Sequence, residues 1–379
     1  MIIVGGVYVE TCVTPERTQL LGSGGRAALA LSSFRSDLVL HTFQPPDYWE
    51  DLEANFRPYG IDCRPAPSSA RIEFSYVFPL ARPVRSPSLI AERPRSAVAG
   101  ADILSVGCVE GEVLVTAERA VIDPQGAPTW HFREDGGQAG RLALVLNASE
   151  AAARTGAQKV EAAALALLSD EGAEVVVVKL GPNGARVFEQ SGADHWIPAY
   201  ASTANYKIGS GDIFSAIFAH FWFEGMNPAG AADRASQHVA AYVESGALPL
   251  PVTLLPRQPR RPSGAEHLVM VMRHASIASK WFSDILQKAA ADLGIAKVET
   301  VDLGSFLAGN IGPTADSAIL ICALDRNSAD AVLSNQWVRE RQATVFIDAS
   351  IVNQRDEASG VRIVSDLSQA LYDACWMVE

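Results

Sequence analysis

The segment from Tyr206 to Ala216 carries the residues best suited to chemistry. A glycine-rich turn, Gly209-Ser-Gly211, ends at Asp212, and an apolar, helix-like run follows at once. Glycines let backbone N–H groups converge, and a helix start adds unpaired donors and a positive dipole end. This pattern favours phosphoryl transfer, with Asp212 as candidate base and Gly209, Ser210 and Gly211 as candidate anion hole. A plain turn followed by a capping aspartate is the structural alternative.

In each of three upstream segments, an apolar strand is followed by polar residues. Residues 175–185 run from a buried strand through Lys179 into a turn with Gly181 and Gly184, which either approaches nucleotide phosphates or is an ordinary turn. Asn147 and Glu150 have capping-box spacing, and the same pair could hold a Mg²⁺-bound water network. Val121-Ile-Asp-Pro124 ends a third strand with an aspartate directed to the same face.

A linker-like segment at Val252–His267 carries three prolines, a glycine and three arginines between two apolar blocks. We expect a domain over 1–251, a linker over 252–267 and a domain over 268–379. In the first block, strands alternate with helices, which predicts a doubly wound, mainly parallel α/β sheet. The expected strands are 2–4, 38–42, 103–106, 120–122, 143–146 and 175–180, and the expected helices are 48–59, 149–155, 160–170 and 213–224.

Two further patterns complete the expected architecture. Residues 71–80 and 88–93 are expected to form extended segments of a small lid. The second block is expected to be a Rossmann- or flavodoxin-like unit. Its expected strands are 268–272, 297–301, 317–323 and 343–347, and its expected helices are 278–293, 329–341 and 365–375.

Composition narrows the function classes. The chain has 379 residues, 48% of them hydrophobic and 20% charged, as in soluble globular proteins. A net charge of −12 argues against a broad nucleic-acid surface. The five cysteines lack a CxxC pair, and no signal peptide or 18-residue apolar span is recognisable, so a cytoplasmic protein without a membrane partner is expected.

In combination, these segments resemble the pfkB family of carbohydrate kinases, typified by ribokinase and adenosine kinase, over about residues 1–250. Gly209-Ser-Gly-Asp212 matches the second half of the family's Asp-Thr-x-Gly-Ala-Gly-Asp signature. Asn147 and Glu150 match its Asn-x-x-Glu motif, and residues 180–185 match its nucleotide-binding strand and turn. The resemblance implies a ribokinase-like sheet with a small β lid.

The resemblance also implies an activity, which is ATP-dependent phosphorylation of a sugar or nucleoside hydroxyl. Asp212 would deprotonate the hydroxyl while the Gly209–Gly211 amides steady the phosphoryl group. Mg²⁺ would lie near Glu150. By the same resemblance, a homodimer formed through the lid is expected, and the residues implied at the ATP site are Lys179, Gly181, Gly184, Asn147 and, near the adenine, Gln237.

The sequence departs from the family on the acceptor side. Glu10 stands near the family's sugar-binding aspartate, and Gly24 and Gly25 are kept, but Leu29 replaces the asparagine of the Gly-Gly-x-x-x-Asn motif. Much of the usual lid is expected to be missing or rebuilt. Tyr206-Lys-Ile208 replaces the first half of the signature, and Lys207 either neutralises phosphate charge or is a solvated loop residue. The phosphate half is thus predicted intact and the sugar half altered.

The last 112 residues weakly resemble the nucleoside 2-deoxyribosyltransferase family, in a strand over 317–324 that leads to Asp325. The nucleophile position, 334–336, lacks a carboxylate, and Glu340 lies more than a turn further on, which argues against glycosyl transfer. Arg273 and His274 follow the first strand. Three readings stay open: a kinase, a kinase scaffold that became a nucleotide or sugar sensor, and a bifunctional nucleoside-salvage enzyme.

Overall fold

The structure is a computed structural model and falls into two compact units. The N-terminal unit comprises Met1–Pro79, Pro83–Ala201 and Tyr206–Gln258, and the C-terminal unit comprises Leu80–Arg82, Ser202–Asn205 and Pro259–Glu379. None of the described helices is long and apolar enough to cross a membrane. The described residues are 1–90, 92–125, 131–262, 267–272, 277–293, 295, 297–309, 317–323, 326–334, 344–347 and 362–376.

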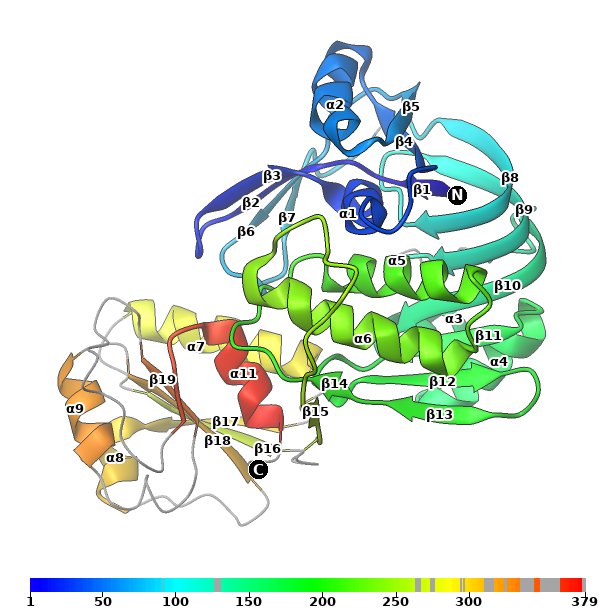
Figure 1. Ribbon diagram of the computed structural model, residues 1–379. Coiled ribbons are helices and arrows are strands. Elements are labelled where there is room, and N and C mark those ends of the chain that lie inside the picture. Colours follow the sequence, from blue (N-terminus) through cyan, green and yellow to red (C-terminus); the bar gives the residue numbers. More distant parts are fainter. Residues whose placement is uncertain are drawn as a thin grey trace. The chain divides into compact units, whose positions relative to one another are not determined.

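Within these residues, nine strands form the main sheet of the N-terminal unit (Figure 1). The strands from β11 to β5 run parallel, and β12 and β13 close one edge in antiparallel pairing. The predicted parallel sheet is therefore confirmed. In spatial order the strands are β13 (Asp194–Ile197), β12 (Ala185–Glu189), β11 (Val175–Lys179), β10 (Gln138–Asn147), β9 (Glu112–Asp123), β8 (Arg95–Val106), β1 (Ile2–Gly5), β4 (Val39–Gln44) and β5 (Asp62–Pro67).

Alternate residues of the central strands enter two separate cores. Val145 and Val177 pack in one core, while their neighbours Leu144 and Val176 pack in the other. A strand that buries both of its faces needs apolar residues at every position, which explains the unbroken Val, Leu and Ile runs. Helices α1 (Gly22–Leu31), α2 (Trp49–Phe56), α5 (Ser210–Phe223) and α6 (Pro228–Ser245) contribute to the first core, and α3 (Ala148–Thr155) and α4 (Val160–Asp170) to the second.

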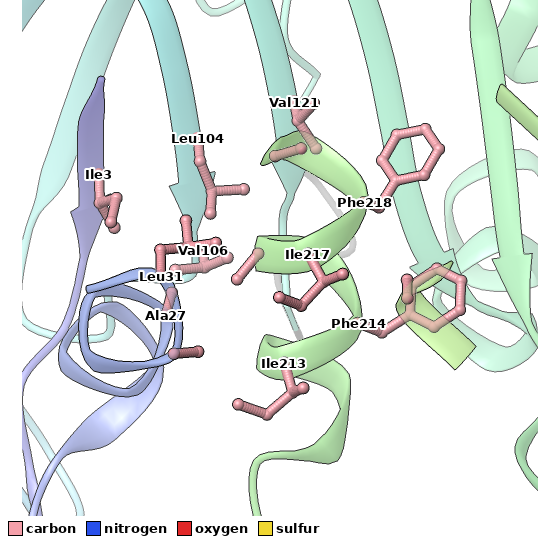
Figure 2. Close-up of a cluster of buried hydrophobic side chains, with 14 of the residues drawn as sticks. Ile3, Ala27, Leu31, Leu104, Val106, Val121, Ile213, Phe214, Ile217 and Phe218 are labelled. Carbon is pink, nitrogen blue, oxygen red and sulfur yellow. The ribbon is translucent and has the colours of Figure 1, made fainter. Parts of the chain in front are cut away.

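Helix α5 lies in the middle of the first core. Figure 2 shows Ile213 and Ile217 beside Ala27 and Leu31 of α1 and against the residues that β1, β8 and β9 contribute, among them Val121. These side chains are fully buried. Because α5 packs along its length against α1 and the sheet, the position of its first turn is fixed by the core.

The small sheet beside the main one is larger than the sequence indicated. It has the order β3 (Arg17–Leu20), β2 (Val9–Cys12), β6 (Glu73–Tyr76) and β7 (Val84–Ser86). The predicted segment 71–80 contains β6. The described residues of the predicted segment 88–93 contain no strand, because β7 ends at Ser86 and Pro87, which follows it, has no amide to continue the pairing.

Two strands of the main sheet are longer than predicted. Strands β8 and β9 each span 12 residues, whereas the apolar runs predicted only their last parts. Their first halves alternate between exposed and less exposed residues, so these halves carry no continuous apolar signal.

The C-terminal unit has a parallel sheet in the order β17 (Lys297–Asp302), β16 (His267–Met272), β18 (Ser317–Ala323), β19 (Thr344–Ile347) and β20 (Arg362–Val364). Asp366 caps the last helix by accepting a hydrogen bond from the Gln369 amide. Arg273, His274, Asp325 and Glu340 lie outside the described residues. The helices described are α7 (Ile277–Asp292), α8 (Leu303–Leu307), α9 (Arg326–Ser334) and α11 (Leu367–Cys375).

Candidate functional site

The candidate anion hole is the first turn of α5. Gly209 precedes the helix with φ 75°, a left-handed conformation that favours glycine, and no side chain caps the helix. The Ser210 amide donates to the Lys207 carbonyl at 3.1 Å. Because first-turn amides have no partner inside a helix, the amides of Gly211 and Asp212 remain to face an anion. Of the amides predicted to form the hole, at Gly209, Ser210 and Gly211, that of Ser210 is already paired within the chain.

Asp212 lies in this first turn and is 5% exposed. Arg26 Nη1 donates to its Oδ2 at 2.7 Å, and Gln125 Nε2 donates to its Oδ1. The hydroxyl of Ser23 in turn donates to Gln125 Oε1 at 2.7 Å. Both oxygens of the candidate base therefore already accept hydrogen bonds from the chain itself.

Arg26 joins Asp212 to Glu10. Its Nη2 forms a short ion pair with Glu10 on β2, and its Nε donates to the Tyr242 hydroxyl at 3.1 Å. Burial raises the pKa of Glu10, and Arg26 opposes that rise. Burial alone would lower the pKa of Arg26, but Glu10, Tyr242 and Asp212 hold it well above its usual value. One buried guanidinium thus serves two buried carboxylates.

The sequence reasoning missed Arg26, although a signal was present. Arg26 is the single charge in a helix of small and apolar residues, and it is 1% exposed. A Cβ at Gly209 would lie 2.0 Å from Arg26 Nε, so the space for the guanidinium exists because residue 209 is glycine. A lone arginine on the buried face of a helix implies a carboxylate partner.

A second ion pair lies beside the anion hole. Lys179, at the end of β11, donates to Asp123 Oδ2 at 2.6 Å, and the Ser215 hydroxyl donates to the same oxygen at 2.6 Å. Burial raises the pKa of Asp123 to about 6, against the lowering effect of Lys179. A Cβ at Gly211 would be 3.4 Å from Lys179 Nζ, which places this ammonium against the first turn of α5.

Asn147 and Glu150 form the predicted capping box. The Glu150 amide donates to Asn147 Oδ1 at 2.8 Å, and the Asn147 amide donates to Glu150 Oε2 at 2.9 Å. Asn147 pairs in register with Lys179, so both lie at the carboxyl edge of the sheet. The Glu150 charge contributes to raising the pKa of Asp123, whose Oδ1 is buried without a hydrogen-bond partner in the described part of the chain. These two carboxylates fit a Mg²⁺ ion that is held mainly by phosphates and water.

The other residues predicted to bind the nucleotide lie in the turn after β11 and on α6. Gly181 (φ 58°) and Gly184 (φ 81°) form the tight turn between the antiparallel strands β11 and β12. A Cβ at Gly184 would lie 2.0 Å from the Ile197 carbonyl oxygen, so close packing accounts for that glycine. Gln237 lies on α6 and donates to Asp233 at 2.7 Å.

Lys207 is half-buried rather than solvated. Burial, followed by the charge of Lys179, lowers the pKa of Lys207 to about 8. A second ammonium near Lys179 and the start of α5 agrees with the reading in which Lys207 neutralises phosphate charge.

Gly24 and Gly25 lie in the first half of α1, where backbones approach closely. A Cβ at Gly24 would be 2.5 Å from the Gly5 carbonyl, and one at Gly25 would be 2.6 Å from the Phe56 ring. Packing of α1 against β1 and α2 therefore requires both glycines. Leu29, in place of the family's asparagine, is buried in the core.

Tyr8 and Glu110 form another buried polar pair that the sequence reasoning missed. The Tyr8 hydroxyl donates to Glu110 Oε2 at 2.8 Å and accepts from the Val109 amide. Burial raises the pKa of Glu110 to about 7. These residues follow β1 and β8, at the same edge of the sheet as Asp123. A glutamate four positions after the buried end of β8 was the available signal.

Comparison with known proteins finds one family model that matches part of the chain. The model of the "pfkB family carbohydrate kinase" family matches residues 119–248. That segment includes Asp123, Asn147, Lys179 and the start of α5, whereas Glu10 and Arg26 precede it. The chain has no match among the curated proteins.

Several solved structures are similar to about two thirds of the chain. A fructokinase from Vibrio cholerae O395 in a fructose-, ADP- and calcium-bound form has a TM-score of 0.50 and 13% identity, covering 64% of this chain and 92% of its own. A ribokinase from Thermotoga maritima has a TM-score of 0.46 and 18% identity, covering 65% and 93%. A pyrophosphate-dependent kinase in the ribokinase family, complexed with a pyrophosphate analog and myo-inositol, has a TM-score of 0.43 and 13% identity, covering 66% and 97%.

Proposed function

We propose that the N-terminal unit transfers a phosphoryl group from ATP to a hydroxyl of a sugar or nucleoside. The observation that carries this proposal is the start of α5, where a buried carboxylate, two first-turn amides and the Lys179 ammonium lie together. A proton acceptor beside a preorganised anion site is what phosphoryl transfer to an alcohol requires.

In this proposal Asp212 accepts the proton of the acceptor hydroxyl. The hydroxyl oxygen forms a bond to the γ-phosphorus while the bond from that phosphorus to the ADP oxygen breaks. The Gly211 and Asp212 amides donate to the phosphoryl oxygens, and Lys179, held by Asp123, offsets their charge. Bound Mg²⁺ would neutralise part of the phosphate charge, with Glu150 and Asp123 as the nearby carboxylates.

The test is ATP consumption across a panel of pentoses, hexoses, polyols and nucleosides. We expect Asp212→Asn to lower kcat for the best acceptor by about 10³-fold, because the amide cannot accept the proton. Asp170→Asn is the matched control, because this exposed carboxylate at the end of α4 has no role in the proposal. Unchanged turnover in Asp212→Asn would contradict the assignment of the base.

A further inference from the structure

The chain supplies its own hydrogen-bond donors to the candidate base. Arg26 occupies Oδ2 of Asp212 and Gln125 occupies Oδ1. An acceptor hydroxyl also needs one of these oxygens, because it must donate to the base before it loses its proton. An acceptor therefore competes with at least one of the two internal donors.

Arg26 is held too firmly to be the donor that yields. It is 1% exposed and also bonds Glu10, the Gly22 carbonyl and Tyr242. Its departure would leave two buried carboxylates without a counter-ion, which is costly. The Arg26 guanidinium occupies space that any side chain at Gly209 would fill.

Gln125 is held less firmly than Arg26. It is half-buried, and its carboxamide is a neutral donor that Ser23 holds at its other end. Among the described residues it is the only non-glycine residue with positive φ, at 31°. Such backbone strain persists where the surroundings enforce it and gathers at functional sites. Strain favours a movement that relieves it.

We propose that Gln125 is a latch over Asp212 that opens for the acceptor, while Arg26 stays as a fixed partner of the base. This proposal rests on the proposed function for the identity of the base. Gln125 is a positioning residue that acts through Asp212, and the acceptor takes over the Oδ1 position that Gln125 leaves.

The latch also defines the class of acceptor. Glu10 is engaged by Arg26 and the Gly22 backbone, so it cannot join Asp212 in binding two neighbouring ring hydroxyls. Arg26 balances only one of the two carboxylates, and the remaining negative charge repels an anionic acceptor. The favoured acceptor is an uncharged or cationic alcohol that presents a single hydroxyl to Oδ1.

A kinetic experiment tests the latch with Gln125→Ala and Ser23→Ala, using the acceptor that the panel turns over fastest. Removing the competing donor is expected to lower the acceptor KM about tenfold in Gln125→Ala and less in Ser23→Ala, which only loosens Gln125. An unchanged or raised KM in Gln125→Ala overturns the latch. So does a tenfold fall of kcat at constant KM, which would make Gln125 an orienting residue for catalysis.

A second readout does not depend on activity. Carboxylates are coupled to an amine with a water-soluble carbodiimide, and the labelled peptides are quantified by mass spectrometry. In Gln125→Ala, Asp212 is expected to react several-fold faster than in the wild type, while Glu10 reacts at the same rate because Arg26 stays. Equal labelling of Asp212 in both proteins, or a parallel rise at Glu10, overturns the latch. Selective labelling of Asp212 without ATP consumption by any panel member keeps the latch and refutes the kinase function.

Discussion

The two ends of the candidate site, one proposed for phosphate and one for the acceptor, differ in their balance of charged side chains. Next to the anion hole, Lys179 faces Asp123 and a second ammonium, that of Lys207, lies nearby. On the acceptor side, a single guanidinium, Arg26, is shared by Glu10 and Asp212. The first end is therefore suited to receive phosphates, and the second keeps a surplus of negative charge. The proposed phosphate end thus brings two ammonium groups together, and the proposed acceptor end is organised around one arginine.

The family match covers the proposed phosphate end and part of the proposed acceptor end. Residues 119–248 include Lys179 and also Asp212, whereas Glu10 and Arg26 precede them. Changes of substrate require changes among the groups that contact the acceptor, whereas the phosphate chemistry needs the same parts in each case.

Removing Arg26 is the strongest way to break the acceptor side. Arg26→Met is expected to lower the free energy of unfolding by about 3–5 kcal/mol, because Glu10 and Asp212 lose their buried counter-ion. The double variant Glu10→Gln/Arg26→Met should regain part of the loss, since it leaves only one buried carboxylate. Urea unfolding of the wild type, both single variants and the double variant measures this coupling. A loss below about 1 kcal/mol in Arg26→Met would mean that the ion pairs do not hold this end together.

Gly209 and Gly211 lie in the same turn but contact different ends of the site. Gly209 lies against Arg26, and Gly211 lies against Lys179. Gly209→Ala is expected to cost about 2 kcal/mol or more in unfolding free energy, because of its positive φ and the clash with Arg26. Gly211→Ala should leave stability within about 1 kcal/mol, since alanine suits a helix, but should raise the ATP KM by crowding Lys179. Thermal unfolding and ATP kinetics on both variants distinguish the two effects. Equal destabilisation by the two substitutions would remove the distinction.

A smaller effect is expected from the dependence of the ATP KM on pH. Lys207 has a pKa of about 8, so its ammonium is present below that pH and is lost as the pH rises through it. If Lys207 assists phosphate binding, the ATP KM should rise about three- to tenfold between pH 7 and pH 9. Lys207→Gln should show a higher KM at pH 7 and a flatter profile. Matching profiles for the wild type and the variant would return Lys207 to a purely structural role.

The sequence predicted the features that depend on neighbouring residues. The Gly-x-Gly-Asp pattern located the turn and the start of α5, and the spacing of Asn147 and Glu150 predicted their capping box. The unbroken apolar runs predicted a sheet covered on both faces. In each case a few consecutive residues contain the physical cause.

The features that were missed depend on residues far apart in the chain. Arg26 and Asp212 are separated by 186 positions, and Gln125 and Asp212 by 87. Strands β2 and β3 of the small sheet have only four residues each, too few to show an apolar period. Their pairing with β6 and the placement of Arg26 follow from tertiary packing, which local patterns do not contain.

We propose that the phosphate end binds ATP while the acceptor end is closed to ring diols. Paired calorimetric titrations of the wild-type protein, one with Mg²⁺-ATP and one with myo-inositol, test both parts of this proposal. Saturable binding of Mg²⁺-ATP and no detectable heat from myo-inositol at millimolar concentration is the predicted result. Binding of myo-inositol without binding of Mg²⁺-ATP would contradict the account.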